Sequence, residues 1–214
     1  MKKIQTLILT GLLSVGLNAY AGNVVFSNIH ADIDVAFEDG SLELVVHDHT
    51  HDIEYDAKDV VLRVNGNART TVPADTEYSF LGAAGSPVWI LPAVQDPTLL
   101  FLGTAGEEIP EGEFQGDTVR LTLKRITGPG EFAMYAFDPF GIPVIEMNTR
   151  DGITADDGAD VPAGGHTDYN FAFSKAGVYR VTLEATGTLL DGRVVSSGNV
   201  TYTFHVVRSG SAEL

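Results

Sequence analysis

Histidines and aspartates near the start of the chain are spaced two residues apart. His30 and Asp32 form one such pair, and His47 and His49 form another. Successive side chains of a strand point to opposite faces, so each pair shares a face if its segment is a strand. Imidazole and carboxylate groups are ligands of zinc-like divalent metals. The spacing therefore predicts that two or three of these side chains share one metal ion.

The segment between the two pairs predicts a β-hairpin. Asp39-Gly40 separates two stretches in which apolar and polar residues alternate, and this dipeptide favours a type I′ turn, which needs positive φ at both central positions. A turn there pairs the apolar residues of two half-buried strands with one another, which fixes the register. In that register Asp32 lies opposite His47, and His30 lies opposite His49. Opposed Cβ atoms are ~4.5–5.5 Å apart, close enough for the side chains to share one cation.

A third pair occurs late in the chain, where His166 and Asp168 are again two residues apart. Together with the two hairpin pairs, it could complete a site of three or four nitrogen and oxygen ligands. The sequence does not decide whether protein ligands fill every coordination position of the metal, as in a structural site, or leave one free. Zinc is the first expectation for the metal, with manganese or copper as alternatives. Calcium is not expected, because the acidic segment at residues 151–160 lacks the spacing of a calcium-binding loop. The predicted ligands are His30, Asp32, His47 and His166, with His49 and Asp168 as the next candidates.

The elements that must position these residues are predicted to be short strands. Apolar residues alternate with polar ones, and Gly/Pro turns interrupt every helical pattern, which is typical of a sandwich or barrel. We therefore expect an all-β, Ig-like antiparallel β-sandwich that forms a single domain over residues 22–214. After the hairpin, strands are predicted over Val60–Val64, Tyr78–Leu81, Val88–Leu91, Leu99–Leu102, Val119–Ile126, Phe132–Phe137, Val144–Met147, Tyr169–Phe173, Val178–Ala185 and Val200–Val207.

The first 21 residues are predicted to be a signal peptide. Lys2 and Lys3 precede an apolar stretch that ends in Ala19-Tyr20-Ala21, a cleavage-site pattern. Cleavage near Ala21 implies a secreted, periplasmic or extracellular protein. No second hydrophobic segment follows, so membrane insertion is not expected. The chain has no cysteine, which excludes a lipoprotein anchor, disulfides and thiolate ligands.

The composition and motifs narrow the function further. The net charge of −16 disfavours nucleic acid as a partner, because its binders need a basic surface. No G-x-S-x-G, H-E-x-x-H or cysteine nucleophile is present, so we do not expect an enzyme. A metal-dependent hydrolase stays open, with Asp34 or Glu43 as the base that it would need. A second alternative is an adhesion or carbohydrate-binding module that uses an exposed surface at Trp89 and Phe101. The same Gly/Pro-rich segment also fits an irregular crossover with Trp89 in the core.

Four longer segments add a resemblance to a known family. They are IHADIDVAFEDGSLELVVHD, FLGAAGSPVWILPAVQDPTLLFLG, VRLTLKRITGPGEFAMYAFDPFGIPVI and GGHTDYNFAFSKAGVYRVTLEA. The combination of SPVWILP, GPGEF and H-x-x-x-N-F-x-F with G-V-Y resembles the bacterial choice-of-anchor M family, also described as the actinobacterial surface-anchored protein domain. The resemblance runs from about Ile29 to Val207 and implies a secreted β-sandwich module found near metal-uptake transporter components.

The resemblance implies extracellular metal binding, with a transporter component or a cell-surface partner. His30, Asp32, His47 and His166 match polar motif positions of the family. The chain departs from it at Asp168, where a second histidine is frequent, and at Phe171, where tryptophan is common. A carboxylate at the first position would favour manganese or a six-coordinate site over tetrahedral zinc. The anchor that names the family has no counterpart in this sequence.

Overall fold

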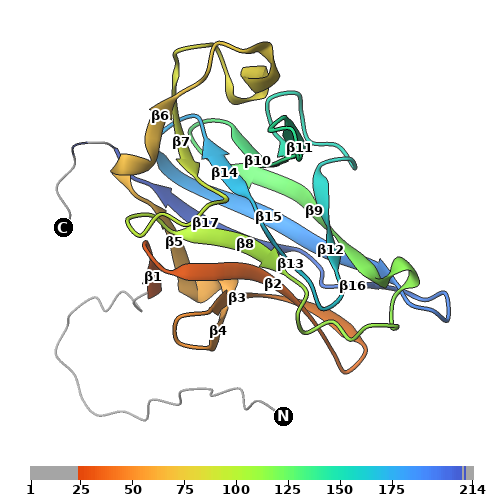
Figure 1. The fold of residues 1–214 in the computed structure, drawn as a ribbon. Helices are drawn as coiled ribbons and strands as arrows, with labels where there is room; N and C mark the ends of the chain where they lie inside the picture. The colour runs from red at the N-terminus through yellow and green to blue at the C-terminus, as the bar shows by residue number, and fades with distance from the viewer. Residues whose placement is uncertain (1–23, 209, 211–214) are drawn as a thin grey trace, which may run out of the picture.

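The computed structural model describes residues 24–208 and residue 210. The predicted signal peptide lies outside the described residues. The all-β prediction is confirmed, because strands form three sheets that pack as a sandwich-like fold (Figure 1). Most strand pairs are antiparallel, as predicted, but three are parallel: β1 (Val24–Phe26) with β5 (Val60–Val64), β5 with β17 (Val200–Val206), and β2 (His30–Glu38) with β8 (Phe101–Ala105).

The described strands form one seven-stranded sheet and two five-stranded sheets. The first sheet contains β1 (Val24–Phe26), β5 (Val60–Val64), β17 (Val200–Val206), β15 (Gly177–Thr188), β9 (Thr118–Thr127) and β12 (Gly158–Pro162), with β16 (Val194–Ser196) paired to β15. The second sheet contains β11 (Pro143–Asn148), β10 (Phe132–Phe137), β14 (Asn170–Phe173), β7 (Pro87–Leu91) and β6 (Arg69–Thr71). The third sheet contains β13 (His166–Asp168), β8 (Phe101–Ala105), β2 (His30–Glu38), β3 (Ser41–Asp48) and β4 (Ile53–Asp56).

The hairpin of β2 and β3 has the register that the sequence predicts. Asp32 pairs with His47, and the apolar residues of the two strands pair with one another. The turn residues Asp39 and Gly40 have φ values of 49° and 81°, as a type I′ turn requires. The backbone N–H of His49 donates a 3.1 Å hydrogen bond to the carbonyl of His30, which continues the pairing past the end of β3.

The parallel pairing of β2 with β8 is the feature that builds the site. Asp32 is in register with Gly103 of β8, and Gly103 is in turn in register with Asp168 of β13. No hairpin joins β2 to β8, so turn chemistry gives no information on their relative direction. In Figure 1, β13, β8, β2 and β3 lie side by side, so segments from early and late in the chain meet in one sheet.

The core fills the space between the sheets. The first and third sheets pack face to face, and the hydroxyl of Tyr202 on β17 donates to the carbonyl of Val45 on β3 at 3.3 Å. One hydrophobic cluster contains buried residues from all three sheets, including Ile33, Leu91 and Phe204. This cluster gives the third sheet a rigid support on its apolar face.

The prediction of a half-buried β2 is wrong, because both faces of this strand are buried. Asp32 and Asp34 are 0% and 1% exposed. The strand lies in the middle of its sheet, and histidine side chains surround its polar face. Burial of a carboxylate is costly unless it is hydrogen-bonded or paired with a cation. The groups around Asp32 must therefore compensate for the burial of its charge.

Most predicted strands are present, and the differences have local causes. The predicted strand Tyr78–Leu81 is instead a 3-10 helix, η3 (Thr76–Leu81). Phe80 and Leu81 are adjacent and both buried, which a strand with alternating faces does not favour. β15 and β17 pair as expected, with β16 inserted between them in the chain. The other short helices are η1 (Ala57–Asp59), η2 (Gly66–Ala68) and η4 (Gln115–Asp117). Among the described residues, no helix has the length and apolar character needed to cross a membrane.

Candidate metal centre

The carboxylate of Asp32 is the centre of a histidine cluster. Its Oδ2 lies 2.5 Å from Nε2 of His49 and 3.0 Å from Nε2 of His166, and its Oδ1 lies 3.8 Å from Nε2 of His30. One ligand atom from each of these four residues lies within 4.8 Å of the other three. The structure thus brings together one early pair, one residue after β3 and one residue from late in the chain.

Two strands and one turn position these side chains. His30 is the first residue of β2, Asp32 follows on the same face, and His166 is the first residue of β13. His49 follows β3 directly, in a turn that the carboxylate of Asp48 stabilises. Oδ1 of Asp48 accepts hydrogen bonds from the backbone N–H groups of Thr50 at 2.8 Å and His51 at 3.2 Å. The turn therefore directs His49 back over β2 toward Asp32.

Gly103 on β8 provides the space in which the groups meet. A Cβ at this position would lie 2.7 Å from Oδ1 of Asp32, 2.8 Å from the carbonyl oxygen of Thr167 and 3.0 Å from Nε2 of His166. Any side chain would therefore collide with the cluster. Gly103 is not among the residues predicted for the site, although a glycine inside a strand is a recognised sign of close approach by another group.

The imidazole rings pack against one another in an ordered way. His30 and His49 are stacked with ring centroids 4.4 Å apart, whereas His30 and His166 are nearly perpendicular with centroids 5.5 Å apart. The ring of Phe101 packs on the outer side of this group, 4.7 Å from His30. These contacts restrict the rotation of each ring and hold the Nε2 atoms on the side of Asp32.

The electrostatics favour a neutral imidazole at His30. Burial lowers the pKa of His30, and the neighbouring His49 and His166 lower it further, against the opposing effect of Asp32. Its Nε2 is buried and has no hydrogen-bond partner among the described residues. A neutral imidazole with a free nitrogen is the form that binds a metal.

Asp168 lies at the edge of the cluster. Its Oδ1 is 3.5 Å from Nε2 of His166 and has no hydrogen-bond partner within the described part of the chain. Burial raises the pKa of Asp168, and the carboxylate of Asp32 adds to the rise, while the nearby histidines oppose it. It is thus a further oxygen beside the group of four rather than a member of it.

His47 has different neighbours from the other predicted ligands. Its Nδ1 is 4.0 Å from Oδ2 of Asp34, and its Nε2 is 3.4 Å from Oδ1 of Asp52. Its ring is 4.3 Å from the ring of His49. Asp34 is buried, and burial together with the charges of Glu108 and Asp32 raises its pKa to about 7. His47 therefore lies beside the group of four and contacts one of its rings.

Trp89 and Phe101 do not form the exposed surface that an adhesion or carbohydrate-binding module would need. Trp89 is 7% exposed, and its indole N–H donates to the carbonyl of Val207 at 2.9 Å. The guanidinium of Arg69 lies 5.8 Å from its ring centroid. Phe101 is half-buried against His30. Trp89 consequently belongs to the core, where it does not offer a ring face to a ligand.

The donor set determines what the cluster can do. Three imidazole nitrogens and one carboxylate oxygen are donors suited to a divalent transition metal, and thiolates are absent from the chain. The fit is supported by the buried Nε2 of His30 without a partner and by the space that Gly103 leaves. The group of His30, Asp32, His49 and His166 can therefore hold a metal ion.

No protein-family model matches the chain, and neither a curated protein nor a solved structure matches it. The resemblance to the choice-of-anchor M family thus stays a prediction.

Proposed function

We propose that the protein binds a divalent transition metal, zinc first, through His30, Asp32, His49 and His166. The observation that carries this proposal is the convergence of three imidazole Nε2 atoms on one carboxylate that is 0% exposed. A buried carboxylate is costly to keep without compensation. A cation bound among these groups would offset that cost and would coordinate all four residues at once.

Unpartnered atoms support a metal over a simple hydrogen-bond network. Nε2 of His30 and Oδ1 of Asp168 are buried without a hydrogen-bond partner among the described residues. Leaving a buried polar atom unpaired costs ~1–3 kcal/mol. In a network that served stability alone, such atoms would be expected to find partners. A bound cation gives His30 a partner directly and attracts the nearby carboxylate of Asp168.

The choice among metals depends on Asp168. Three imidazoles and one carboxylate fit tetrahedral zinc. Recruitment of the second carboxylate would add a hard oxygen ligand and favour manganese, while copper is also compatible with an imidazole-rich site. Zinc is the first expectation, because the group of four is complete without Asp168.

The proposed role is extracellular capture of the metal, for surface display or for transfer to a metal-uptake transporter component. The predicted signal peptide and the family resemblance support this role, and the acidic net charge of −16 would attract cations toward the protein. A surface partner or transporter component would receive the metal from the site.

A competition titration with a chromophoric chelator tests the proposal. Zinc, manganese and copper affinities would be measured for wild type, Asp32→Asn and His205→Ala. Asp32→Asn keeps the shape of the side chain and removes its charge, so metal affinity should fall by at least about 100-fold. His205 is an exposed histidine on β17, so its replacement should leave affinity unchanged. Equal affinity in wild type and Asp32→Asn would refute the proposal.

A further inference from the structure

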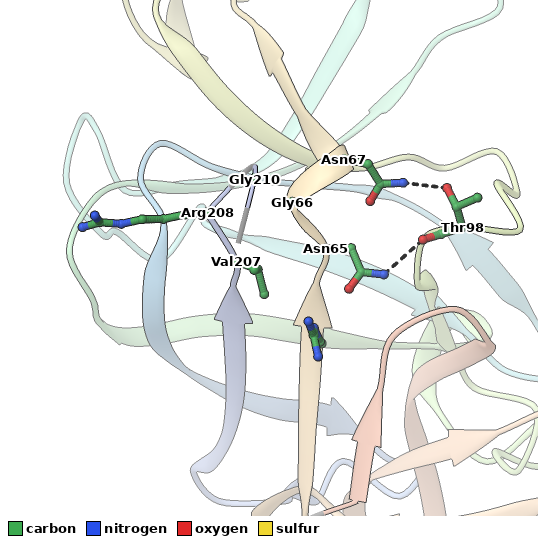
Figure 2. Close-up of a pocket in the computed structure, with 8 residues that line it drawn as sticks. Asn65, Gly66, Asn67, Thr98, Val207, Arg208 and Gly210 are labelled. Carbon is green, nitrogen blue, oxygen red and sulfur yellow. Dashed lines mark hydrogen bonds between the residues drawn. The ribbon is translucent and has the colours of Figure 1, made fainter. Parts of the chain in front are cut away.

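A polar pocket of about 300 Å³ lies where β5 and β17 end (Figure 2). Its walls come from the turn after β5, from the loop before β8 and from the chain that follows β17. The pocket shares no residue with the metal site, so its function can be tested independently. The lining residues are Arg63, Asn65, Gly66, Asn67, Thr98, Val207, Arg208 and Gly210.

Arg63 is one of the two arginines that line this pocket. It lies on β5 in register with His205 of β17. Its Nε is buried and has no hydrogen-bond partner, and no ion pair joins it to another described residue. A buried guanidinium N–H without an acceptor is costly, and all the polar hydrogens of arginine are donors. The pocket is therefore lined by a guanidinium group whose Nε–H has no acceptor among the described residues.

Asn65 and Asn67 supply acceptors that are held in place. The amide nitrogen of Asn65 donates to the carbonyl of Thr98 at 3.1 Å, and that of Asn67 donates to the hydroxyl of Thr98 at 2.7 Å (Figure 2). Thr98 is itself fixed, because its N–H and hydroxyl both donate to Asp96, at 2.8 Å and 2.7 Å. The two side-chain carbonyls accept no hydrogen bond from the described residues. They are therefore available, in fixed positions, to groups that donate.

Charge distinguishes this pocket from the rest of the molecule. The protein has a net charge of −16, yet two arginines line the pocket and no acidic residue does. In Figure 2 the Arg208 side chain extends away from Asn65. Arg208 thus adds positive potential beside the pocket, and Arg63 is the arginine that would contact a ligand. An anion is the kind of ligand that such an arrangement attracts.

We infer that the pocket binds a small oxyanion that also carries hydroxyl groups, such as a hexuronic acid or a sugar phosphate. Guanidinium groups recognise carboxylate and phosphate through charge-assisted hydrogen bonds. Hydroxyl groups of the same ligand donate to the carbonyls of Asn65 and Asn67. The volume is at the lower end of the range for small-molecule sites, which favours a monosaccharide-sized ligand over a polymer.

Isothermal titration of the full chain with glucuronate, glucose 6-phosphate and neutral glucose tests this inference. At least one acidic sugar should bind, and glucose should bind at least tenfold more weakly. Arg63→Gln should weaken binding of the acidic sugar at least tenfold. Arg193→Gln is the matched control, because Arg193 is an exposed arginine paired with Asp191 at 2.8 Å, and this variant should bind like wild type.

If Arg63→Gln does not fold, measurements on the wild-type protein still test the inference. In wild-type protein, NMR signals of the side-chain amides of Asn65 and Asn67 should shift during the titration with the acidic sugar. Failure of both acidic sugars to bind, or equal binding of glucose, would overturn the inference. A variant ending at Gly210 separates a free ligand from the protein's own C-terminal residues. Binding that occurs only in that shortened variant would identify those residues as the occupant and would also overturn it.

Discussion

At the scale of single residues, Asp32 explains why the histidines gather where they do. Its carboxylate is fully buried and lies within 3.0 Å of the Nε2 atoms of His49 and His166. His30 completes the group from the same strand. His47, opposite Asp32 in the register, instead lies near Asp34 and Asp52. The two histidines of the His47-x-His49 pair therefore have different roles, which can be separated by substitution.

His49→Ala should reduce zinc affinity by more than about 100-fold, whereas His47→Ala should reduce it by about tenfold or less. His49 is a proposed ligand, and His47 only packs against its ring, 4.3 Å away. Groups that hydrogen-bond to a ligand cost about 10–100-fold when removed, and His47 makes only a ring contact, so its loss should cost no more than the lower end of that range. Chelator competition measures both affinities. A larger loss in His47→Ala than in His49→Ala would show that the group of four is assigned wrongly.

Zinc affinity should fall steeply as the pH drops through about 6.5, the ordinary pKa of histidine. Protons compete with the metal for each imidazole, so each ligand that must lose a proton contributes about tenfold per pH unit. Burial lowers the pKa of His30. The folded apoprotein therefore binds fewer protons there than the unfolded chain, so its stability also falls as the pH drops. Titrations from pH 8 to 5 measure both effects, and full affinity at pH 5 would contradict a histidine site.

The sequence predicted how the residues of the β2–β3 hairpin lie relative to one another, but not which residues meet in the cluster. The spacing of His30 and Asp32 and the hairpin register are short-range properties, and both are correct in the structure. The contact between Asp32 and His166 is long-range and depends on β8 lying between β2 and β13. Residue spacing alone could place His166 and Asp168 on one face of a strand. It could not show which of the other predicted ligands would lie next to that face.

At the scale of the elements, β8 determines the geometry of the site. It pairs in parallel with β2 and antiparallel with β13, so Asp32, Gly103 and Asp168 lie in one row across three strands. The missing side chain at Gly103 lets groups from the flanking strands approach across the middle strand. The type I′ turn could be predicted from Asp39-Gly40, but this row could not, because no short connection joins the three strands.

Gly103→Ala should abolish high-affinity metal binding and destabilise the apoprotein by about 1–3 kcal/mol, the usual cost of overpacking. The added Cβ would lie 2.8 Å from the backbone oxygen of Thr167, which cannot rotate away. Gly187→Ala is the control, because its Cβ would lie 2.5 Å from the ring of Phe114, a clash that involves none of the proposed ligands. It should lose stability yet retain zinc affinity. Normal zinc affinity in Gly103→Ala would contradict the proposed role of this glycine.

At the scale of the whole molecule, the composition and strand pattern were enough to predict an all-β sandwich, but not its three sheets or its parallel pairs. Tryptophan illustrates the ambiguity. The segment around Trp89 fits either a core position or an exposed binding surface, and only packing decides between them. The structure places Trp89 in the core, 7% exposed.

Trp89→Ala should destabilise the protein by about 3–5 kcal/mol, the usual cost of removing a buried aromatic side chain. Its effect on zinc affinity should be negligible under conditions where the variant is folded. Urea denaturation measures the first quantity, and chelator competition the second. Unchanged stability would contradict the core assignment of this residue.

Metal removal should lower the stability of the whole domain, because the proposed ligands tie the end of β3 and the start of β13 to β2. At a free zinc concentration of about 100 times Kd, binding adds about 2.7 kcal/mol, or about 5–10 °C in Tm for a domain of this size. Calorimetry with and without EDTA measures this shift. It should disappear in His49→Ala, and an equal shift in that variant would indicate binding elsewhere.

The most direct test of the account is the metal content of untagged protein, exported in its native compartment and measured by plasma mass spectrometry. Wild type should contain near-stoichiometric zinc, or manganese or copper in its place, and the His49→Ala/His166→Ala double variant should contain none. No metal in the wild type, even after reconstitution, or equal metal in both proteins, would contradict the assignment of this histidine cluster as a metal centre.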